Sequence, residues 1–169
     1  MKIIFLDIDG VLNCQNTFIE RHKKKVITGY HDLEIDINMV KYLSQIVEKT
    51  NGLVVLSSSW RIFFCYENGL LKAFDKGLQL VNLLNKYNIA IYDITPYVTN
   101  RNRGLEIVNW LSCHDVSNFI IIDDEKCDLM DLKDNLILCD FYGDGLNYQL
   151  SLEAINKLNS KKCSKIKRF

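Results

Sequence analysis

The sequence predicts an α/β fold, a Rossmann-like three-layer α/β/α sandwich with a central, mainly parallel sheet of five strands. Short apolar runs alternate with segments of helical period, which is typical of a parallel sheet covered by helices on both faces. Polar or acidic residues follow most of these runs, as expected where strand ends form a ligand site. The 169 residues suit one domain with a substantial core. We expect a single domain over residues 1–160 and a basic tail over residues 161–169.

Five short apolar runs are the predicted strands, because each is bounded by polar or turn-forming residues. They are Lys2–Leu6, Leu53–Leu56, Ile89–Tyr92, Phe119–Ile122 and Leu136–Cys139.

Four apolar stripes at helical spacing predict helices that pack against the sheet. The first follows Asp36, which suits a helix N-cap, and ends at Asn51-Gly52. The other three begin at Leu71, Leu105 and Ser151.

Residues 13–34 are irregular and polar and carry a basic run at Arg21–Lys25. We expect a loop or small flap there, over the end of the first strand. No segment is long enough to form a large cap, so we expect a minimal one. The stretch between the serines at 57–59 and Arg103 is predicted to hold mainly a helix, a strand and a turn.

Composition is that of an ordinary soluble protein, with 48% hydrophobic and 25% charged residues and a formal net charge of zero. Neither nucleic-acid nor membrane attraction follows from the overall charge. The six cysteines are scattered without the spacing of a zinc site, which favours reduced thiols. No signal peptide or membrane span is recognisable. We therefore expect a cytoplasmic location and no membrane partner.

Asp7 and Asp9 directly follow the first predicted strand, with Ile8 between them. Side chains alternate along an extended chain, so both carboxylates are expected on one side. The repulsion between the two carboxylates would cost on the order of several kcal/mol at an intermediate dielectric. Mg²⁺, which prefers oxygen ligands, would remove that cost and could also bind a phosphate. Asp123 and Asp124, after the fourth predicted strand, are candidates for the same ion.

Two such carboxylates suit the hydrolysis of a phosphate monoester, which is among the slowest uncatalysed reactions. One carboxylate can attack phosphorus to give an acyl phosphate, and the other can protonate the leaving oxygen and later accept a proton from water. A serine hydroxyl and backbone N–H groups can hold the phosphoryl oxygens, and an arginine can neutralise their charge.

Four segments in this order and at these separations resemble the motifs of the haloacid dehalogenase-like (HAD) superfamily of hydrolases. They are DIDGVLN, LSSSWR, RGLEIVNWL and IIIDDEKCDL. The chain is most similar to the small, nearly capless members associated with RNA-repair proteins. Those members share a WR pair after the serines, a helix like that of RGLEIVNWL, and a GL pair after the last strand. In this chain the GL pair is Gly145-Leu146.

The resemblance implies that Asp7 is the nucleophile and that Asp9 is the general acid/base, with its backbone carbonyl also on the metal. Asp124 would be the third metal ligand, with Asp123 beside it. Asp128 is either a supporting residue behind the ligands or a solvated one.

For the phosphate, the resemblance implies Gly10 and a serine of the second motif. Ser57 is the first candidate, and Ser58 is the alternative because the triple serine leaves the register open by one. Arg103 would be the cation of the third motif, with Arg101 as its competitor.

Trp60 and Arg61 follow these serines and are either substrate contacts or packing residues, and packing is the commoner role for a tryptophan beside a site.

The predicted function is Mg²⁺-dependent phosphomonoester hydrolysis through an aspartyl phosphate. The resemblance implies a bulky substrate, because an open site in this superfamily commonly accepts one, and the run at Arg21–Lys25 would suit a polynucleotide. The expected partner is therefore a phosphorylated substrate such as a nucleic-acid end or a nucleotide. The alternatives are a non-catalytic phosphate-binding module and a phosphotransferase.

Overall fold

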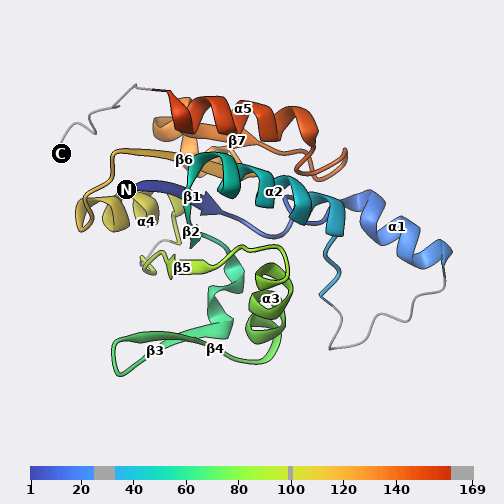
Figure 1. Ribbon diagram of the computed structural model, residues 1–169, viewed down its shortest axis with the longest axis horizontal. Coiled ribbons are helices and arrows are strands. Elements are labelled where there is room, and N and C mark those ends of the chain that lie inside the picture. Colours follow the sequence, from blue (N-terminus) through green and yellow to red (C-terminus); the bar gives the residue numbers. More distant parts are fainter. Residues whose placement is uncertain (25–32, 99–100, 161–169) are drawn as a thin grey trace.

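A five-stranded sheet forms the centre of the protein in a computed structural model that describes residues 1–24, 33–98 and 101–160 (Figure 1). The strand order is β5-β2-β1-β6-β7, and every neighbouring pair is parallel. The strands are β1 (Lys2–Leu6), β2 (Leu53–Leu56), β5 (Ile91–Ile94), β6 (Asn118–Asp123) and β7 (Leu136–Leu138). The α/β/α fold class expected from the sequence is confirmed.

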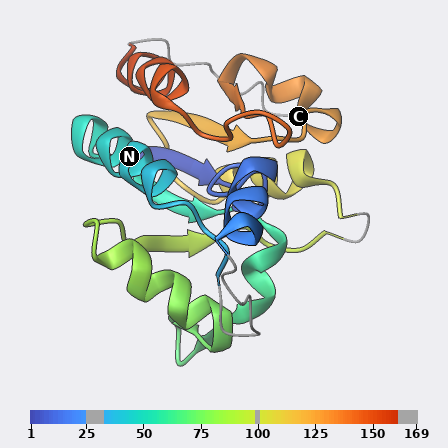
Figure 2. The same cartoon turned by 90° about the vertical axis from the view of Figure 1, so that its right-hand side faces the viewer.

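Helices cover both faces of the sheet (Figures 1 and 2). On one face, Ile4 and Leu6 of β1 join a core built with α2 (Ile37–Thr50), α3 (Asp75–Asn85) and α5 (Tyr148–Asn159). On the other face, the remaining apolar side chains of β1 pack with those of α4 (Arg103–Ser112) and of the 3-10 helix η2 (Cys127–Asn135). Strand β1 is central because its side chains are apolar in both directions, as a doubly covered strand requires.

Polar side chains fix the starts of three helices. Asp36 accepts a hydrogen bond from the backbone N–H of Asn38, and Asn102 and Asn147 cap α4 and α5 in the same manner. Helix α2 ends at Asn51, which has φ of 54°. The sequence located this helix correctly because both of its end signals are strong.

Several boundaries differ from the sequence predictions, and three of these differences have a local cause. The stripe from Leu71 is not helical at its start, since α3 begins at Asp75 and Leu71 lies in a strand. Helix α5 begins at Tyr148, before Ser151, because Asn147 is its cap. Strand β5 lies two residues later than Ile89–Tyr92, because Ile89 is still hydrogen-bonded to the end of α3.

One α-helix and a two-stranded hairpin were missed, as were the two 3-10 helices. Helix α1 (Gln15–Lys23) occupies part of the segment predicted as a loop, whereas residues 25–32, with Lys25 of the basic run, lie outside the described residues. A hairpin of β3 (Phe64–Glu67) and β4 (Leu70–Ala73) precedes α3. Its turn is Asn68-Gly69, with φ of 53° and 76°. An Asn-Gly pair is a recognised hairpin signal, so this hairpin could have been predicted from the sequence. The basic tail, residues 161–169, also lies outside the described residues.

Candidate active site

The register of the sheet brings three strand ends together. Leu6 of β1 lies beside Leu56 of β2 and Ile122 of β6, so the next residues of these strands meet at one edge. The backbone N–H of Asp7 donates to Ile122 O over 3.0 Å, and that of Ser57 donates to Leu6 O over 2.8 Å. Residues that are distant in sequence thereby become neighbours.

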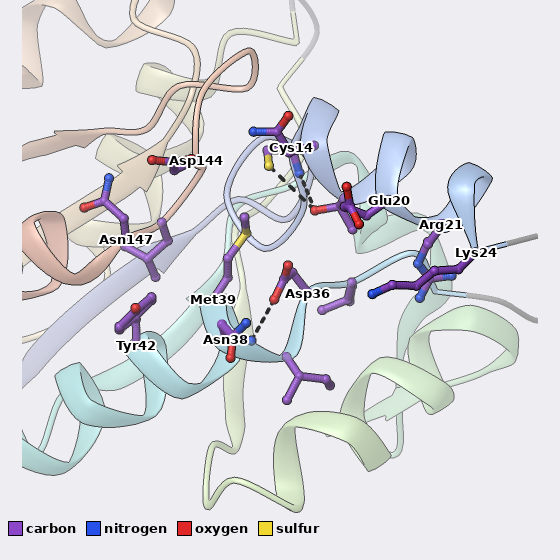
Figure 3. A pocket seen from close by; sticks show the side chains of 15 residues that line it. Cys14, Glu20, Arg21, Lys24, Asp36, Asn38, Met39, Tyr42, Asp144 and Asn147 are labelled. Atoms are coloured by element: carbon purple, nitrogen blue, oxygen red, sulfur yellow. Dashed lines mark hydrogen bonds between the residues drawn. The ribbon is translucent and has the colours of Figure 1, made fainter. Parts of the chain in front are cut away.

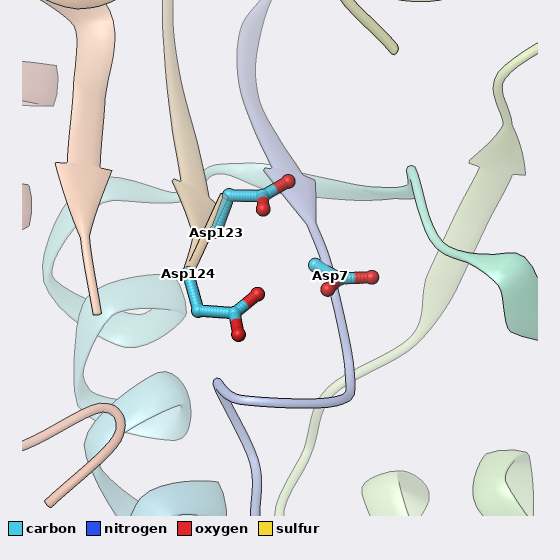
Figure 4. A group of neighbouring side chains, drawn as sticks. All are labelled: Asp7, Asp123 and Asp124. Atoms are coloured by element: carbon cyan, nitrogen blue, oxygen red, sulfur yellow. The ribbon is translucent and has the colours of Figure 1, made fainter. Parts of the chain in front are cut away.

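Three acidic side chains gather at this edge (Figure 4). Asp7, Asp123 and Asp124 each offer a carboxylate oxygen, and these oxygens lie within 4.8 Å of one another. Asp7 and Asp123 are buried, and Asp124 is partly exposed. Such a set of oxygen donors matches the preference of Mg²⁺.

Arg103, the first residue of α4, is the cation in contact with this cluster. Its Nη1 lies 3.3 Å from Asp7 Oδ2 and 2.5 Å from Asp123 Oδ2. A cation at a helix N-terminus is unfavourable on dipole grounds, and the two carboxylates offset that cost. Arg101, the competing candidate, is exposed and has φ of 50°. The contacts therefore favour Arg103 as the third-motif cation.

The electrostatics of the cluster also fit a dication. Burial raises the pKa of Asp7 to about 7, opposed by the charge of Arg103 and reinforced by the charge of Asp123. Burial likewise raises the pKa values of Asp123 and Asp124, again against the charge of Arg103. Three carboxylates facing one guanidinium leave two formal negative charges if all are ionised, which is the charge that Mg²⁺ would neutralise.

Gly10 lets the loop after β1 pass directly against Asp124. Its φ is 77°, and a Cβ at this position would lie 2.1 Å from Asp124 Oδ2. Both the backbone conformation and the close approach require glycine here. Gly10 therefore shapes the acidic cluster, and its expected role in phosphate binding stays a prediction.

Asp9 is exposed, and its carboxylate is not part of the acidic cluster. Instead it accepts two hydrogen bonds: Trp60 Nε1 donates to Oδ2 over 2.9 Å, and Asn13 Nδ2 donates to Oδ1 over 3.0 Å. Asn13 is buried and also accepts the backbone N–H of Gly10. Asn13 was not among the predicted site residues, although its place at the end of DIDGVLN could have suggested a turn-stabilising role.

The two candidate serines have different surroundings. Ser58 Oγ accepts the backbone N–H of Trp60 at the start of the 3-10 helix η1 (Ser59–Phe63), and its hydroxyl also hydrogen-bonds with Asp7. Ser57 Oγ is buried and has no hydrogen-bond partner within the described part of the chain. Since a buried hydroxyl without a partner is costly, Ser57 is the better candidate for a ligand such as a phosphoryl oxygen.

Arg61 is a structural residue. It is buried, and its Nη2 donates to Glu106 Oε2 of α4 over 2.8 Å. Its Nη1 donates to the backbone O and the Oγ1 of Thr95, just after β5. The interaction ties η1 to α4 and to the end of β5, which supports the packing interpretation of this arginine. Asp128 is exposed and does not belong to the acidic cluster.

Among the described helices, none combines the length and the apolar character that a membrane span requires.

The fold and the acidic cluster at the end of β1 are those of a HAD-like domain. The family model described as "HAD domain in Swiss Army Knife RNA repair proteins" matches residues 3–148. The chain belongs to this family. Comparisons with curated proteins and with solved structures gave no match.

Proposed function

We propose that the protein is a Mg²⁺-dependent phosphomonoesterase that acts through an aspartyl phosphate at Asp7. The observation that carries the proposal is the cluster at the end of β1, where the buried Asp7 carboxylate lies among Asp123, Asp124 and Arg103. A carboxylate so placed can approach a phosphate that is held by a cation and by oxygen-binding groups.

In the first step, an Asp7 carboxylate oxygen forms a bond to phosphorus while the bond from phosphorus to the ester oxygen breaks. Asp9 gives its proton to that departing oxygen, so the product leaves as an alcohol. In the second step, Asp9 accepts a proton from water as the water oxygen attacks phosphorus. The acyl phosphate breaks at its P–O bond, which releases inorganic phosphate, frees the Asp7 carboxylate and leaves Asp9 protonated again.

Other residues hold the phosphoryl group and its charge. Arg103 would neutralise part of the charge on the transferring oxygens, and Ser57 Oγ would donate a hydrogen bond to one of them. Asp7, Asp124 and Asp123 would hold Mg²⁺, together with the backbone carbonyl of Asp9. When bound, the ion supplies Lewis-acid stabilisation of the phosphoryl oxygens and neutralises the carboxylates.

The proposed substrate is the phosphorylated end of a nucleic acid, or a nucleotide. Membership of a family named after RNA-repair proteins supports this choice. The position of Asp9 at an exposed edge also supports it, because a large leaving group would not have to be enclosed.

A metal-dependent substrate screen tests the proposal. The purified protein, with and without Mg²⁺, is given phosphorylated oligonucleotide ends, nucleotides, sugar phosphates and phosphopeptides, and inorganic phosphate is measured. We expect Mg²⁺-dependent release from oligonucleotide ends or nucleotides, and loss of release in Asp7→Asn. A correctly folded protein that binds phosphate but turns over none of these esters would instead be a phosphate-binding module. Transfer of phosphate to an added alcohol, in preference to water, would indicate a phosphotransferase.

A further inference from the structure

A pocket of about 270 Å³ opens beside Asp9 on the outer side of the acidic cluster. Its lining combines four apolar or aromatic side chains with the Asp9 and Asn13 pair and with three further polar or charged residues, Glu34, Ser59 and Lys76. The pocket residues that matter here are Asp9, Asn13, Leu33, Trp60, Ile62 and Phe63. Three of them come from η1, which begins two residues after Ser57.

The chemistry of the site determines what this pocket would face. Asp9 is the proposed proton donor to the departing ester oxygen, so the organic part of the substrate must lie on the side of Asp9. The pocket includes Asp9 but none of Asp7, Asp123 and Asp124. It is therefore placed to receive the leaving group and not the phosphate.

The pocket walls offer an aromatic ring and apolar side chains beside polar groups, which suits a flat heteroaromatic group. Trp60 is partly exposed and meets Phe63 edge to face, with ring centroids 6.0 Å apart and an interplanar angle of 71°. Ile62 is 62% exposed and so offers an apolar surface to a group in the pocket. The volume lies just below the range typical of drug-sized ligand pockets, so it suits a single ring system.

We infer that this pocket binds the nucleobase of the nucleotide that carries the phosphate, with the base against Trp60 and Ile62. The inference rests on the proposed function and adds a specificity site to it. Every base presents a π-face, so such a platform accepts different bases and discriminates against a phosphate ester that has none. Because the Trp60 indole also binds Asp9, base and proton donor are held by one side chain.

A larger hollow elsewhere does not suit this role. It measures about 540 Å³ and lies between α1, the start of α2 and the loop before α5 (Figure 3). Its lining includes Glu20, Arg21, Asp36 and Asp144, but neither Asp9 nor a member of the acidic cluster. A group bound there would not face the proposed proton donor.

The test compares substrates with and without a base. The kcat/KM values for adenosine 3′- and 5′-monophosphate are measured against that for ribose 5-phosphate, in wild type and in Ile62→Ala. We expect the better nucleotide to exceed ribose 5-phosphate by about 5- to 150-fold, the equivalent of one stacked base. Ile62→Ala should lower this ratio by about 3- to 10-fold. Leu70→Ala is the matched control, because Leu70 is 63% exposed on the hairpin and does not line the pocket.

A binding measurement keeps this inference separate from the proposed reaction. In Asp7→Asn, the quenching of tryptophan fluorescence by adenosine monophosphates is followed, with ribose 5-phosphate as the probe that lacks a base. Trp110 is only 3% exposed, so a saturable change should come from Trp60 and should disappear in Trp60→Phe.

Saturable quenching by the nucleotides alone supports the pocket even if no ester is hydrolysed, which would refute only the proposed reaction. Equal kcat/KM for ribose 5-phosphate and both nucleotides, or nucleotide binding that leaves Trp60 unquenched, would overturn the pocket assignment while leaving phosphomonoesterase activity intact.

Discussion

The indole N–H of Trp60 donates a hydrogen bond to the carboxylate of Asp9 over 2.9 Å, and thereby links the second motif to the first. Trp60 lies 51 positions away from Asp9 in sequence. The bond fixes one oxygen of the proposed proton donor, and Asn13 fixes the other. We therefore expect Trp60 to position Asp9 for proton transfer.

Trp60→Phe should weaken proton donation more than phosphate binding. We expect kcat for phenyl phosphate, which has a poor leaving group, to fall by up to about 10-fold, because a hydrogen bond to a charged group contributes about 1.5–3 kcal/mol and Asn13 remains in place. The kcat for 4-nitrophenyl phosphate, whose leaving group needs little protonation, should fall less. An equal loss for both esters would contradict the positioning role.

A second tryptophan offers the control. Trp110 Nε1 donates to Asp93 Oδ2 over 2.7 Å, but this pair does not include Asp9. Trp110→Phe should lower the free energy of unfolding and leave the ratio of the two kcat values unchanged.

Gly10→Ala should disrupt metal binding by displacing Asp124. An added Cβ would lie 2.1 Å from Asp124 Oδ2, and the φ of 77° adds backbone strain. Gly69 has nearly the same φ, 76°, but nothing lies within 4 Å of an added Cβ. Isothermal titration with Mg²⁺ should give affinity at least about 10-fold weaker in Gly10→Ala and unchanged in Gly69→Ala. Comparable Mg²⁺ affinity in the two variants would show that the contact between a Cβ at position 10 and Asp124 does not affect metal binding.

The sequence predicted the elements with strong local signals. The strand ahead of Asp7 is a continuous apolar run, and α2 carries both Asp36 at its start and Asn51 at its end, so both were located correctly. Helix α1 was missed because only Thr17 is buried in it, and a helix without an apolar stripe has no periodicity to detect.

The convergence of Asp7, Asp123 and Asp124 could be predicted because all three lie at the carboxyl ends of buried strands of a parallel sheet. Contacts between side chains could not. The Arg61–Glu106 pair joins η1 to α4, and no local pattern in the sequence indicates that these two elements come into contact.

Removing one partner of the Arg61–Glu106 pair should strongly destabilise the folded protein. Both side chains are buried, with exposures of 7% and 2%, so Glu106→Gln would leave a buried guanidinium without its counter-charge. We expect a loss of about 3–5 kcal/mol in the free energy of unfolding, measured with urea. Glu153→Gln removes the more exposed Glu153–Lys157 pair and should cost at most about 1 kcal/mol. A similar loss of unfolding free energy in both variants would contradict the greater importance of the buried Arg61–Glu106 pair.

The Asp7 carboxyl should make the metal-free protein less stable as pH rises. Its pKa is about 7 in the folded protein against 3.8 when unperturbed, so the folded state binds the proton more tightly. The resulting stabilisation is complete below about pH 4 and is lost as pH rises through about 7. The difference in unfolding free energy between wild type and Asp7→Asn should therefore fall between pH 4 and 7.5, by at least about 1.4 kcal/mol, the equivalent of one pKa unit.

Mg²⁺ should reverse this trend, because the ion binds the ionised carboxylates. The increase in melting temperature on adding Mg²⁺ should grow from pH 5 to pH 7.5 in wild type and be smaller in Asp7→Asn and Asp124→Asn. A Mg²⁺ effect independent of pH, or equal in all three proteins, would argue against this site.

The most direct test of the account is to find the phosphoryl group on Asp7. The protein is mixed with Mg²⁺ and the best ester from the substrate screen, quenched in acid within the first turnovers, and digested for peptide mass spectrometry. We predict a phosphoryl group on Asp7 that hydroxylamine removes, and neither turnover nor label in Asp7→Asn. Sustained turnover by Asp7→Asn, or a phosphoryl group on any other residue, would contradict the assignment of Asp7 as the nucleophile.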